Sequence, residues 1–284
     1  MRSTMRWTVL AVVFLTAGCI PGSRGIASDW PAMPAPQAFV PEADTCHAAV
    51  VSTVSAKSYN PIDCGQKHLV ETIHVGQLSG AIAELPDPPG LDDEAAEPAY
   101  VECDKGAKAK LGRNWRDFQL DLQVRLPSEG AWQAGARWVR CDVVVLSDLA
   151  RNTNDDLVEQ TGRLDSSKLL LGCFDYKSGS DPRLTGVACT TAHNAEYVGA
   201  EILPPGTKYP ETDEEWNKIH DRCFALAAAF VDIAVDDLPT GVSSWVESEA
   251  RWSGGDRSVR CYLWLDQKTM TASAKGTKGQ GIPS

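Results

Sequence analysis

The pattern of apolar and polar positions along the chain predicts mostly β-strands. Residues 118–126 alternate apolar and polar side chains, which is typical of a strand that buries one face. Further strands are predicted at 71–75, 139–146, 245–252 and 258–265. Residues 44–64 are predicted to form a hairpin, with a β-rich stretch, a turn at 55–60 and a return strand. Antiparallel sheet is therefore expected to dominate.

Two segments depart from this pattern and are predicted to be helices. Residues 100–111 have a helix-favouring composition. Residues 211–231 form a longer candidate, opened by Thr212 with Glu215 three positions later, which is the pattern of a capping box. Strand-forming residues flank each helix, so a sheet with one helix packed on it is expected twice.

Cysteine spacing divides the same region into two similar parts. The eight cysteines after residue 40 form two sets of four, with steps of 18, 39 and 38 residues in the first set and 16, 34 and 38 in the second. The string C-x3-H-x2-E begins at Cys64 and again at Cys189. The string W-x2-G-x-R-x-V-R-C occupies residues 132–141 and again 252–261. Two motifs repeated in the same order indicate an internal duplication.

The predicted strands and helices of the two copies indicate an α+β fold. Two tandem copies of a small disulfide-stapled domain are expected, each an antiparallel sheet with one packed helix. Copy 1 is placed at 44–148 and copy 2 at 168–266, joined by a polar linker at 149–167. The tail at 267–284 is rich in Gly, Lys, Thr and Ser and is expected to be disordered.

The N-terminus has the features of an export signal. Arg2 and Arg6 precede an apolar run at 7–17, which is too short to span a bilayer as a mature helix. Small residues and then Cys19 end the run, an order that resembles the lipobox of bacterial lipoproteins. In that family the cysteine is alkylated with diacylglycerol and becomes the new N-terminus. The alternative is an ordinary secretory signal with a chance cysteine.

The lipobox resemblance implies a signal peptide at 1–18 and a chain held through Cys19 at the extracytoplasmic face of the membrane. Several acyl chains on one residue form a stable anchor, since each buried CH₂ contributes about 0.8 kcal/mol. Residues 19–43 are rich in proline, which favours an extended tether between the lipid and copy 1. Membrane lipid is therefore the first expected partner.

The remaining eight cysteines are expected to be paired. Export places them in an oxidising compartment, where disulfides are the default, and four cysteines per copy allow three connectivities each. We favour pairing the first two and the last two, because a hairpin brings its ends within disulfide reach. The favoured disulfides are Cys46–Cys64, Cys103–Cys141, Cys173–Cys189 and Cys223–Cys261.

Two ionisable pairs recur in both copies, His68 with Glu71 and His193 with Glu196. One interpretation is a general base held by a carboxylate. The other is a hydrogen-bonded pair that holds a turn beside a disulfide. We favour the second, because no nucleophile is evident nearby and such buried pairs are commonly structural. No catalytic residue is assigned, and the four side chains are retained as possible binding residues.

Arg137 and Arg257 occupy the same place in the second motif and are also possible binding residues. They could bind anionic groups. They could instead stack on Trp132 and Trp252 or pair with carboxylates, and we favour these internal contacts.

Neither a metal nor a cofactor is expected. The C-x3-H spacing lacks the paired ligands of structural zinc sites, and exported thiolates oxidise. The sequence contains no P-loop, Gly-rich dinucleotide motif, G-x-S-x-G elbow or H-E-x-x-H helix. The formal charge of −11 becomes −13 when the two arginines of the signal are removed. Such a charge repels nucleic acid, which is therefore not expected as a partner.

The two motifs, their spaced cysteines and the intervening helix resemble the septum formation-related domain of actinobacterial membrane proteins and lipoproteins. The resemblance covers both copies. It implies an extracytoplasmic role at the septum or elsewhere in the envelope, with an unknown envelope or division protein as partner, and it implies no catalytic mechanism. We favour a non-enzymatic binding or scaffold role. The alternative is an envelope hydrolase or transferase that uses His68 and Glu71, or His193 and Glu196.

Mass spectrometry of the mature protein tests the export and disulfide predictions together. We expect Cys19 to be the N-terminus and to carry acyl chains. The other eight cysteines should not react with alkylating reagents, because all are paired. Free thiols throughout, or an intact unacylated N-terminus in the cytosol, would contradict these predictions.

Overall fold

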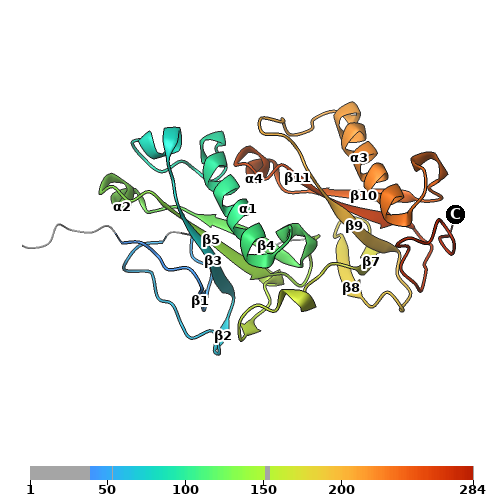
Figure 1. Ribbon diagram of the computed structural model, residues 1–284, viewed down its shortest axis with the longest axis horizontal. Helices are drawn as coiled ribbons and strands as arrows, with labels where there is room; N and C mark the ends of the chain where they lie inside the picture. Colours follow the sequence, from blue (N-terminus) through green and yellow to red (C-terminus); the bar gives the residue numbers. More distant parts are fainter. Residues whose placement is uncertain (1–38, 53, 151–153, 284) are drawn as a thin grey trace, which may run out of the picture. The chain divides into compact units, whose positions relative to one another are not determined.

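Two antiparallel sheets, each with one long helix against it, make up most of the protein (Figure 1). The structure is a computed structural model, and it describes residues 39–52, 54–150 and 154–283. These residues belong to one compact unit. The α+β class predicted from the sequence is confirmed.

The first half of the described chain contains β1 (Thr45–His47), β2 (Lys67–His68), β3 (Val70–Gln77), α1 (Glu97–Leu111), β4 (Leu120–Arg125), α2 (Glu129–Gln133) and β5 (Trp138–Val145). Its main sheet has the strand order β1-β3-β5-β4, and α1 packs against β3, β5 and β4. Short 3-10 helices lie at Gly80–Glu84, Glu94–Ala96 and Trp115–Asp117.

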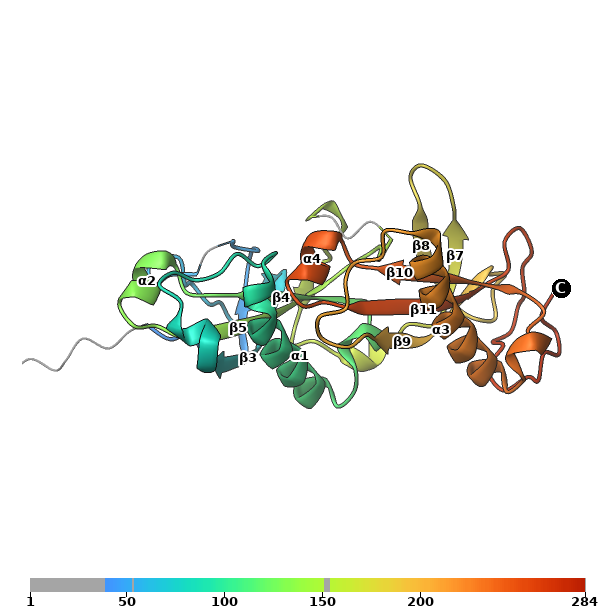
Figure 2. The ribbon, with the colours of Figure 1, turned by 90° about the horizontal axis from the view of Figure 1, so that it is seen from above.

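The second half has the same layout with one more strand. It contains β7 (Cys173–Lys177), β8 (Arg183–Val187), β9 (Ala195–Ile202), α3 (Asp213–Val231), β10 (Gly241–Val246), α4 (Glu249–Ser253) and β11 (Ser258–Trp264). The strand order is β10-β11-β9-β7-β8, so β10 and β8 are its edges. Helix α3 lies against β9, β10 and β11 (Figure 2). Further 3-10 helices lie at Asn154–Asp156, Ser166–Lys168 and Val235–Asp237.

Both sheets share a backbone irregularity at their centre. The pairing of β3 with β5 contains one bulge, between Thr72 and His74. The pairing of β9 with β11 contains one at the matching place, opposite the step from Cys261 to Tyr262. A bulge increases the local twist and changes the direction of the side chains that follow. The two halves therefore agree in register as well as in strand order.

Among the described residues, four disulfides staple the two halves. Cys103 of α1 is joined to Cys141 of β5, and Cys223 of α3 to Cys261 of β11, so each long helix is tied to an inner strand. The other two are Cys46–Cys64 and Cys173–Cys189. These are the same pairs that the sequence favours. A native disulfide stabilises a small domain by about 2–4 kcal/mol, which matters where each core is modest.

Helix α3 begins where the sequence predicts. The Thr212 hydroxyl accepts a hydrogen bond from the backbone N–H of Glu215 (3.3 Å), and the Glu215 carboxylate accepts one from the backbone N–H of Thr212 (3.1 Å). This confirms the capping box. Helix α1 begins at Glu97, earlier than predicted, with Pro98 in its first turn, where the helix does not need the missing N–H.

The strand predicted at 245–252 is only partly correct. Strand β10 ends at Val246, and α4 follows. The Ser248 hydroxyl accepts a hydrogen bond from the backbone N–H of Arg251 (3.3 Å), so Ser248 caps a helical turn. The apolar residues suggested a continuous strand, and the local cap decided otherwise.

The polar tail is ordered, so the expectation of disorder at 267–284 is wrong for its described part. Met270, Ala274 and Ile282 are buried in one cluster with residues of α3 and β11. The backbone N–H of Gly276 donates to a carbonyl in the last turn of α3 (2.9 Å), where a helix leaves its own acceptors free. Composition missed this because three apolar side chains among polar ones are enough to close the core.

The expected linker at 149–167 also packs on the first half. Its residues Gln160–Thr161 form β6, which pairs with β2. Leu157 and Leu164 contact hydrophobic clusters of the first half. The linker therefore closes the first half as the tail closes the second.

The first described residues pack on the protein as well. Trp138 donates through Nε1 to the carbonyl of Phe39 (2.9 Å), and the Phe39 ring contacts Tyr59 and Trp138. The expected tether at 19–43 is therefore wrong for its last residues, because Phe39 belongs to a hydrophobic cluster. The expected signal peptide and the lipid site at Cys19 lie outside the described residues.

Met270→Ala should destabilise the protein by about 2–5 kcal/mol, the range for truncating a buried methionine. Met270 is 7% exposed and forms a backbone bridge with His193. Urea unfolding followed by tryptophan fluorescence measures the free energy of unfolding. The matched control is Thr271→Ala, an exposed neighbour, which should lie within about 0.5 kcal/mol of the unaltered protein. Equal effects of the two substitutions would contradict the packing of the tail.

Candidate functional site

Each half contains a buried His–Glu pair next to a disulfide. In the first half, His68 ends β2 and Glu71 lies on β3. The Nδ1 atom of His68 is hydrogen-bonded to the carbonyl of Gln66 (2.9 Å), and its Nε2 atom lies 3.5 Å from a carboxylate oxygen of Glu71. The Glu71 carboxylate accepts a hydrogen bond from the backbone N–H of Leu164. The pair therefore binds the segment that follows the first half.

The second half repeats this arrangement. The Nδ1 atom of His193 is hydrogen-bonded to the carbonyl of Thr191 (2.7 Å). The Glu196 carboxylate accepts a hydrogen bond from the backbone N–H of Ala274 (2.8 Å). His193 and Met270 exchange two backbone hydrogen bonds (3.0 Å each). In both halves, the carboxylate thus holds the backbone of the segment that comes after the last strand.

Each pair also lies close to a cysteine. The two groups are Cys46, His68 and Glu71, and Cys173, His193 and Glu196, and in each the possible ligand atoms lie within 4.8 Å of one another. Both sulfurs belong to disulfides and both carboxylates already accept hydrogen bonds. Zinc takes thiolate, imidazole or carboxylate ligands, usually four of them. These groups fit internal structural contacts better than a metal centre.

The two motif arginines also make internal contacts. The guanidinium of Arg137 lies 4.1 Å from the ring centroid of Trp132 and donates to the carbonyl of Ala83 (2.7 Å). Arg257 forms an ion pair with Glu97 (2.7 Å), which belongs to the other half. The structure therefore places Arg137 in the stacked contact considered from the sequence and Arg257 at the junction between the halves.

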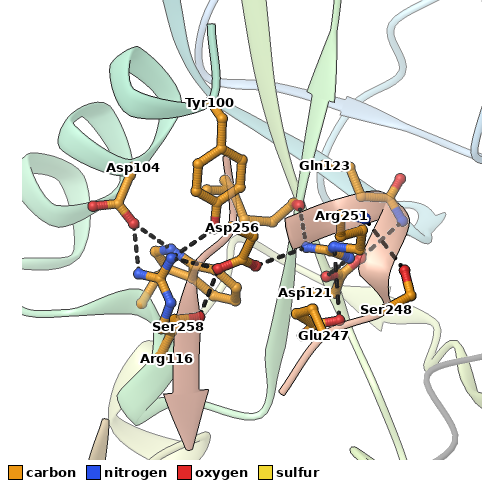
Figure 3. Close-up of polar contacts among 12 residues, drawn as sticks. Tyr100, Asp104, Arg116, Asp121, Gln123, Glu247, Ser248, Arg251, Asp256 and Ser258 are labelled. Carbon is orange, nitrogen blue, oxygen red and sulfur yellow. Dashed lines mark hydrogen bonds and ion pairs between the residues drawn. The ribbon is translucent and has the colours of Figure 1, made fainter. Parts of the chain in front are cut away.

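A buried network of polar side chains joins the halves at this junction (Figure 3). Arg116 is central to it, with a side chain 2% exposed. Arg116 donates to the Tyr100 hydroxyl (2.6 Å) and forms ion pairs with Asp104 (2.5 Å) and Asp256 (2.9 Å). Its guanidinium also lies 4.4 Å from the ring centroid of Trp115. Because Asp256 belongs to the second half, this ion pair crosses the junction.

Arg251 of α4 crosses the junction in the other direction. It donates to the Asp121 carboxylate (2.5 Å) and to the carbonyl of Leu122 (3.1 Å), both on β4. Within its own half it lies 3.4 Å from Asp256 and 3.6 Å from Glu247. Figure 3 shows the Asp256 carboxylate between the two arginine side chains. Asp256 therefore bridges one guanidinium from each half.

Burial and neighbouring charge act in opposite directions on Asp256. Burial favours the neutral acid, but the charges of Arg116 and Arg251, with a hydrogen bond from Ser258, outweigh it and hold the pKa of Asp256 below its usual value. For Glu247 burial dominates and raises the pKa. An ionised Asp256 is therefore a charged partner of both arginines, and its removal would take one carboxylate partner from each.

Two arginines of the second half cover the edge of the first sheet. Strand β4 is an edge strand, and outward backbone groups of an edge need partners. Arg260 donates to the carbonyl of Leu120 (3.0 Å), and Arg251 donates to that of Leu122. The second half thus supplies guanidinium groups where a further strand would supply N–H groups.

An extended segment adds to this edge just before β4. Residues 169–171 pair with residues 117–119 through two backbone hydrogen bonds (2.8 and 2.9 Å) and an antiparallel bridge between Phe118 and Leu170. The junction therefore combines backbone pairing with arginine contacts along one strand edge.

A cleft of about 290 Å³ lies beside the junction. Tyr100, Asp121, Gln123 and Arg125 of the first half line it together with Arg251 of the second. Arg125 donates to Gln123 (2.5 Å), and its Nε atom is buried without a hydrogen-bond partner. Burial lowers the pKa of Arg125. Both halves build this hollow along β4, with apolar as well as polar side chains.

Sequence reasoning missed Arg116, Arg251 and Asp256 because it followed residues that recur in both copies. Aligned on the second motif, Ala131 stands at the place of Arg251, and Ala136 at the place of Asp256. A head-to-tail junction brings together two surfaces that are not equivalent, so its residues must differ between the copies. Charged residues at positions where the two copies differ were the sequence signal that could have identified the junction.

Fold and site define a disulfide-stapled α+β protein whose ionisable groups hold its own segments and its own junction. No helix in the described ranges is both long enough and apolar enough to cross a membrane. A family model described as septum formation matches residues 43–261, and the chain belongs to this family. The resemblance drawn from the sequence motifs is thereby confirmed. Comparisons with curated proteins and with solved structures found no match.

Asp256→Asn should destabilise the protein by about 3–5 kcal/mol near neutral pH, because it removes one partner of the buried Arg116–Asp256 ion pair and the carboxylate that also contacts Arg251. The pKa of Asp256 is lowered by folding, so its ionisation stabilises the folded state above a pH of about 4. This stabilisation is lost as the pH falls toward the folded pKa. Below a pH of about 4 the free energy of unfolding should fall less steeply with pH in the variant than in the unaltered protein. The two slopes should differ by up to about 1.4 kcal/mol per pH unit.

Urea unfolding at a series of pH values measures both effects. The matched control is Asp236→Asn, which removes an exposed carboxylate of the same half. It should change the free energy of unfolding by less than about 0.5 kcal/mol. If Asp256→Asn and Asp236→Asn gave the same stability and the same pH dependence, the network would not join the halves as described.

Proposed function

We propose that this protein is a lipid-anchored docking protein that acts outside the cytoplasm in septum formation and has no catalytic role. A docking protein here binds an envelope or division protein and holds it at the membrane. Membership of the septum formation family supports the role in cell division. The signal-like N-terminus and Cys19 support the location at the outer face of the membrane.

The burial of both His–Glu pairs is the observation that most supports a non-catalytic role. The side chain of His68 is 0% exposed, and His193 is 1% exposed. General acid–base catalysis needs a group within hydrogen-bond reach of a substrate. Here the paired carboxylates accept backbone hydrogen bonds from the protein's own following segments. A substrate could reach either histidine only after that segment had left its place.

Charge and the junction support docking in different ways. With a formal charge of −13 after removal of the signal, the chain is repelled by anionic headgroups, so the lipid on Cys19 would hold it at the membrane rather than surface charge. The ion pairs of Arg116 with Asp256 and of Arg251 with Asp121 join the halves, so both sheets would meet a partner as one body. Nucleic acid is not proposed as a partner.

In cells, a fluorescent fusion to the full chain should gather at the division site, and a deletion strain should form delayed or misplaced septa. Cys19→Ser should move the fusion out of the membrane fraction, because acyl chains supply the membrane affinity, and it should fail to restore division. Microscopy and fractionation measure these outcomes. A uniformly distributed fusion together with normal division in the deletion strain would reject the septal role.

The control for catalysis is the double variant His68→Gln with His193→Gln. Glutamine keeps a hydrogen-bond donor but cannot exchange a proton near neutral pH. At equal protein level and with the membrane location retained, this variant should restore division. A folded, anchored variant that fails to do so would favour the envelope hydrolase or transferase instead.

A further inference from the structure

The edge of the second sheet is open at the place where the edge of the first is covered. Within the described residues, β10 pairs with β11 alone and ends the strand order. Strand β4 holds the same place in the first sheet, and the second half docks on it there. The registers agree as well, since Leu122 pairs with Val143 and Val242 pairs with Leu263. The two edges can therefore be compared residue by residue.

The register identifies the outward backbone groups of β10. In an antiparallel pair, alternate residues direct both N–H and C=O away from the neighbouring strand. On β4 these residues include Leu122, whose carbonyl accepts a hydrogen bond from Arg251. The corresponding residue of β10 is Val242, and Ser244 follows in the same phase. These two residues offer the donors and acceptors that a further strand would use.

Two hollows follow this edge. Residues 239–241 line one of about 340 Å³, and residues 242–244 line one of about 470 Å³. Tyr176, Phe224 and Trp264 add aromatic surface to the larger hollow. An extended peptide that joins a sheet edge gains affinity from main-chain hydrogen bonds and specificity from pockets for its alternate side chains. The β10 edge offers both.

The surroundings of this edge are mainly acidic. Asp221 lines the larger hollow, and Asp266 lines the smaller one together with Lys268. Asp236 and Asp237 are exposed just before β10. Carboxylates near an open edge favour a guest with positive side chains. The second half, which docks on β4, likewise brings arginine side chains to that edge.

We propose that the open edge of β10 binds an extended segment of a partner protein, which adds antiparallel to β10 and carries arginine or lysine side chains. This inference rests on the proposed docking role and names the surface that performs it. The chain shows the same mode at its own junction, where residues 169–171 pair antiparallel beside β4 and Arg251 reaches an edge carbonyl.

A second copy of this chain is a poorer guest for the edge. The surface that covers β4 carries Arg251 and Asp256, whereas the matching surface of the first half carries Ala131 and Ala136. A head-to-tail contact between chains would lack the guanidinium and the carboxylate that join the two halves. This contact between two copies is therefore disfavoured.

The probe is a short blocked peptide of alternating valine and arginine, titrated into the full chain in detergent micelles. Binding should saturate in tryptophan fluorescence and should slow hydrogen exchange at Val242 and Ser244. Ser244→Pro removes one outward N–H and should weaken binding by about tenfold or more. Ser244→Ala is the matched control and should bind within about twofold. Both variants lose the hydroxyl contact with His220, so they differ in the backbone donor.

A second probe needs no change in the protein. Methylating alternate amide nitrogens of the peptide keeps its side chains and removes its donors, so binding should be lost. Equal binding of the two peptides, or of the two Ser244 variants, would overturn the proposal. An oligomer of the full chain that Ser244→Pro abolishes would also overturn it, because the edge would then bind a second copy. Displacement of the peptide by N-acetylglucosamine oligomers would overturn it as well, because the edge would then bind a glycan.

The two proposals fail in different ways. If the peptide does not bind while the fusion still gathers at the septum, the β10 edge is rejected and the docking role is not. If the peptide binds as expected while the fusion is uniform and division is normal, the septal role is rejected and the edge remains a peptide site.

Discussion

The buried carboxylate of Asp256, placed between Arg116 of one half and Arg251 of the other, is the contact on which the joined form of this protein depends. Buried charges are costly unless each has partners at short distance, and here Asp104 and Asp121 complete the set. A buried polar network forms its hydrogen bonds and ion pairs only when its partners meet in the right geometry. It therefore selects how the two halves meet.

The two halves share residues in their interiors and differ at the junction. The shared His68 and His193 pairs lie inside each half, where each carboxylate holds the segment that follows, so the same residues serve both. The junction is head-to-tail, so one half presents its strand edge and the other presents α4. Two similar halves joined by an asymmetric contact leave the edge at β4 covered and, within the described residues, the corresponding edge at β10 open. That asymmetry is the basis of the docking proposal.

The histidines illustrate how a residue pair that recurs in a sequence can suggest either chemistry or a structural contact. A residue that recurs beside a carboxylate in two copies resembles an acid–base pair, yet both rings are enclosed and each lies against its own disulfide. In both halves the paired carboxylate accepts a backbone hydrogen bond from the segment that follows.

The sequence by itself determined the structural features that depend on residues close together in the chain or on motifs that recur along it. The capping box at Thr212, the α+β class and the favoured cysteine pairs all came from spacing along the chain. Only the tertiary structure decided that Phe39 and Met270 belong to the packed core and that Arg116 meets Asp256, 140 positions away. Such contacts depend on which surfaces face each other after folding, and no local pattern of residues encodes that.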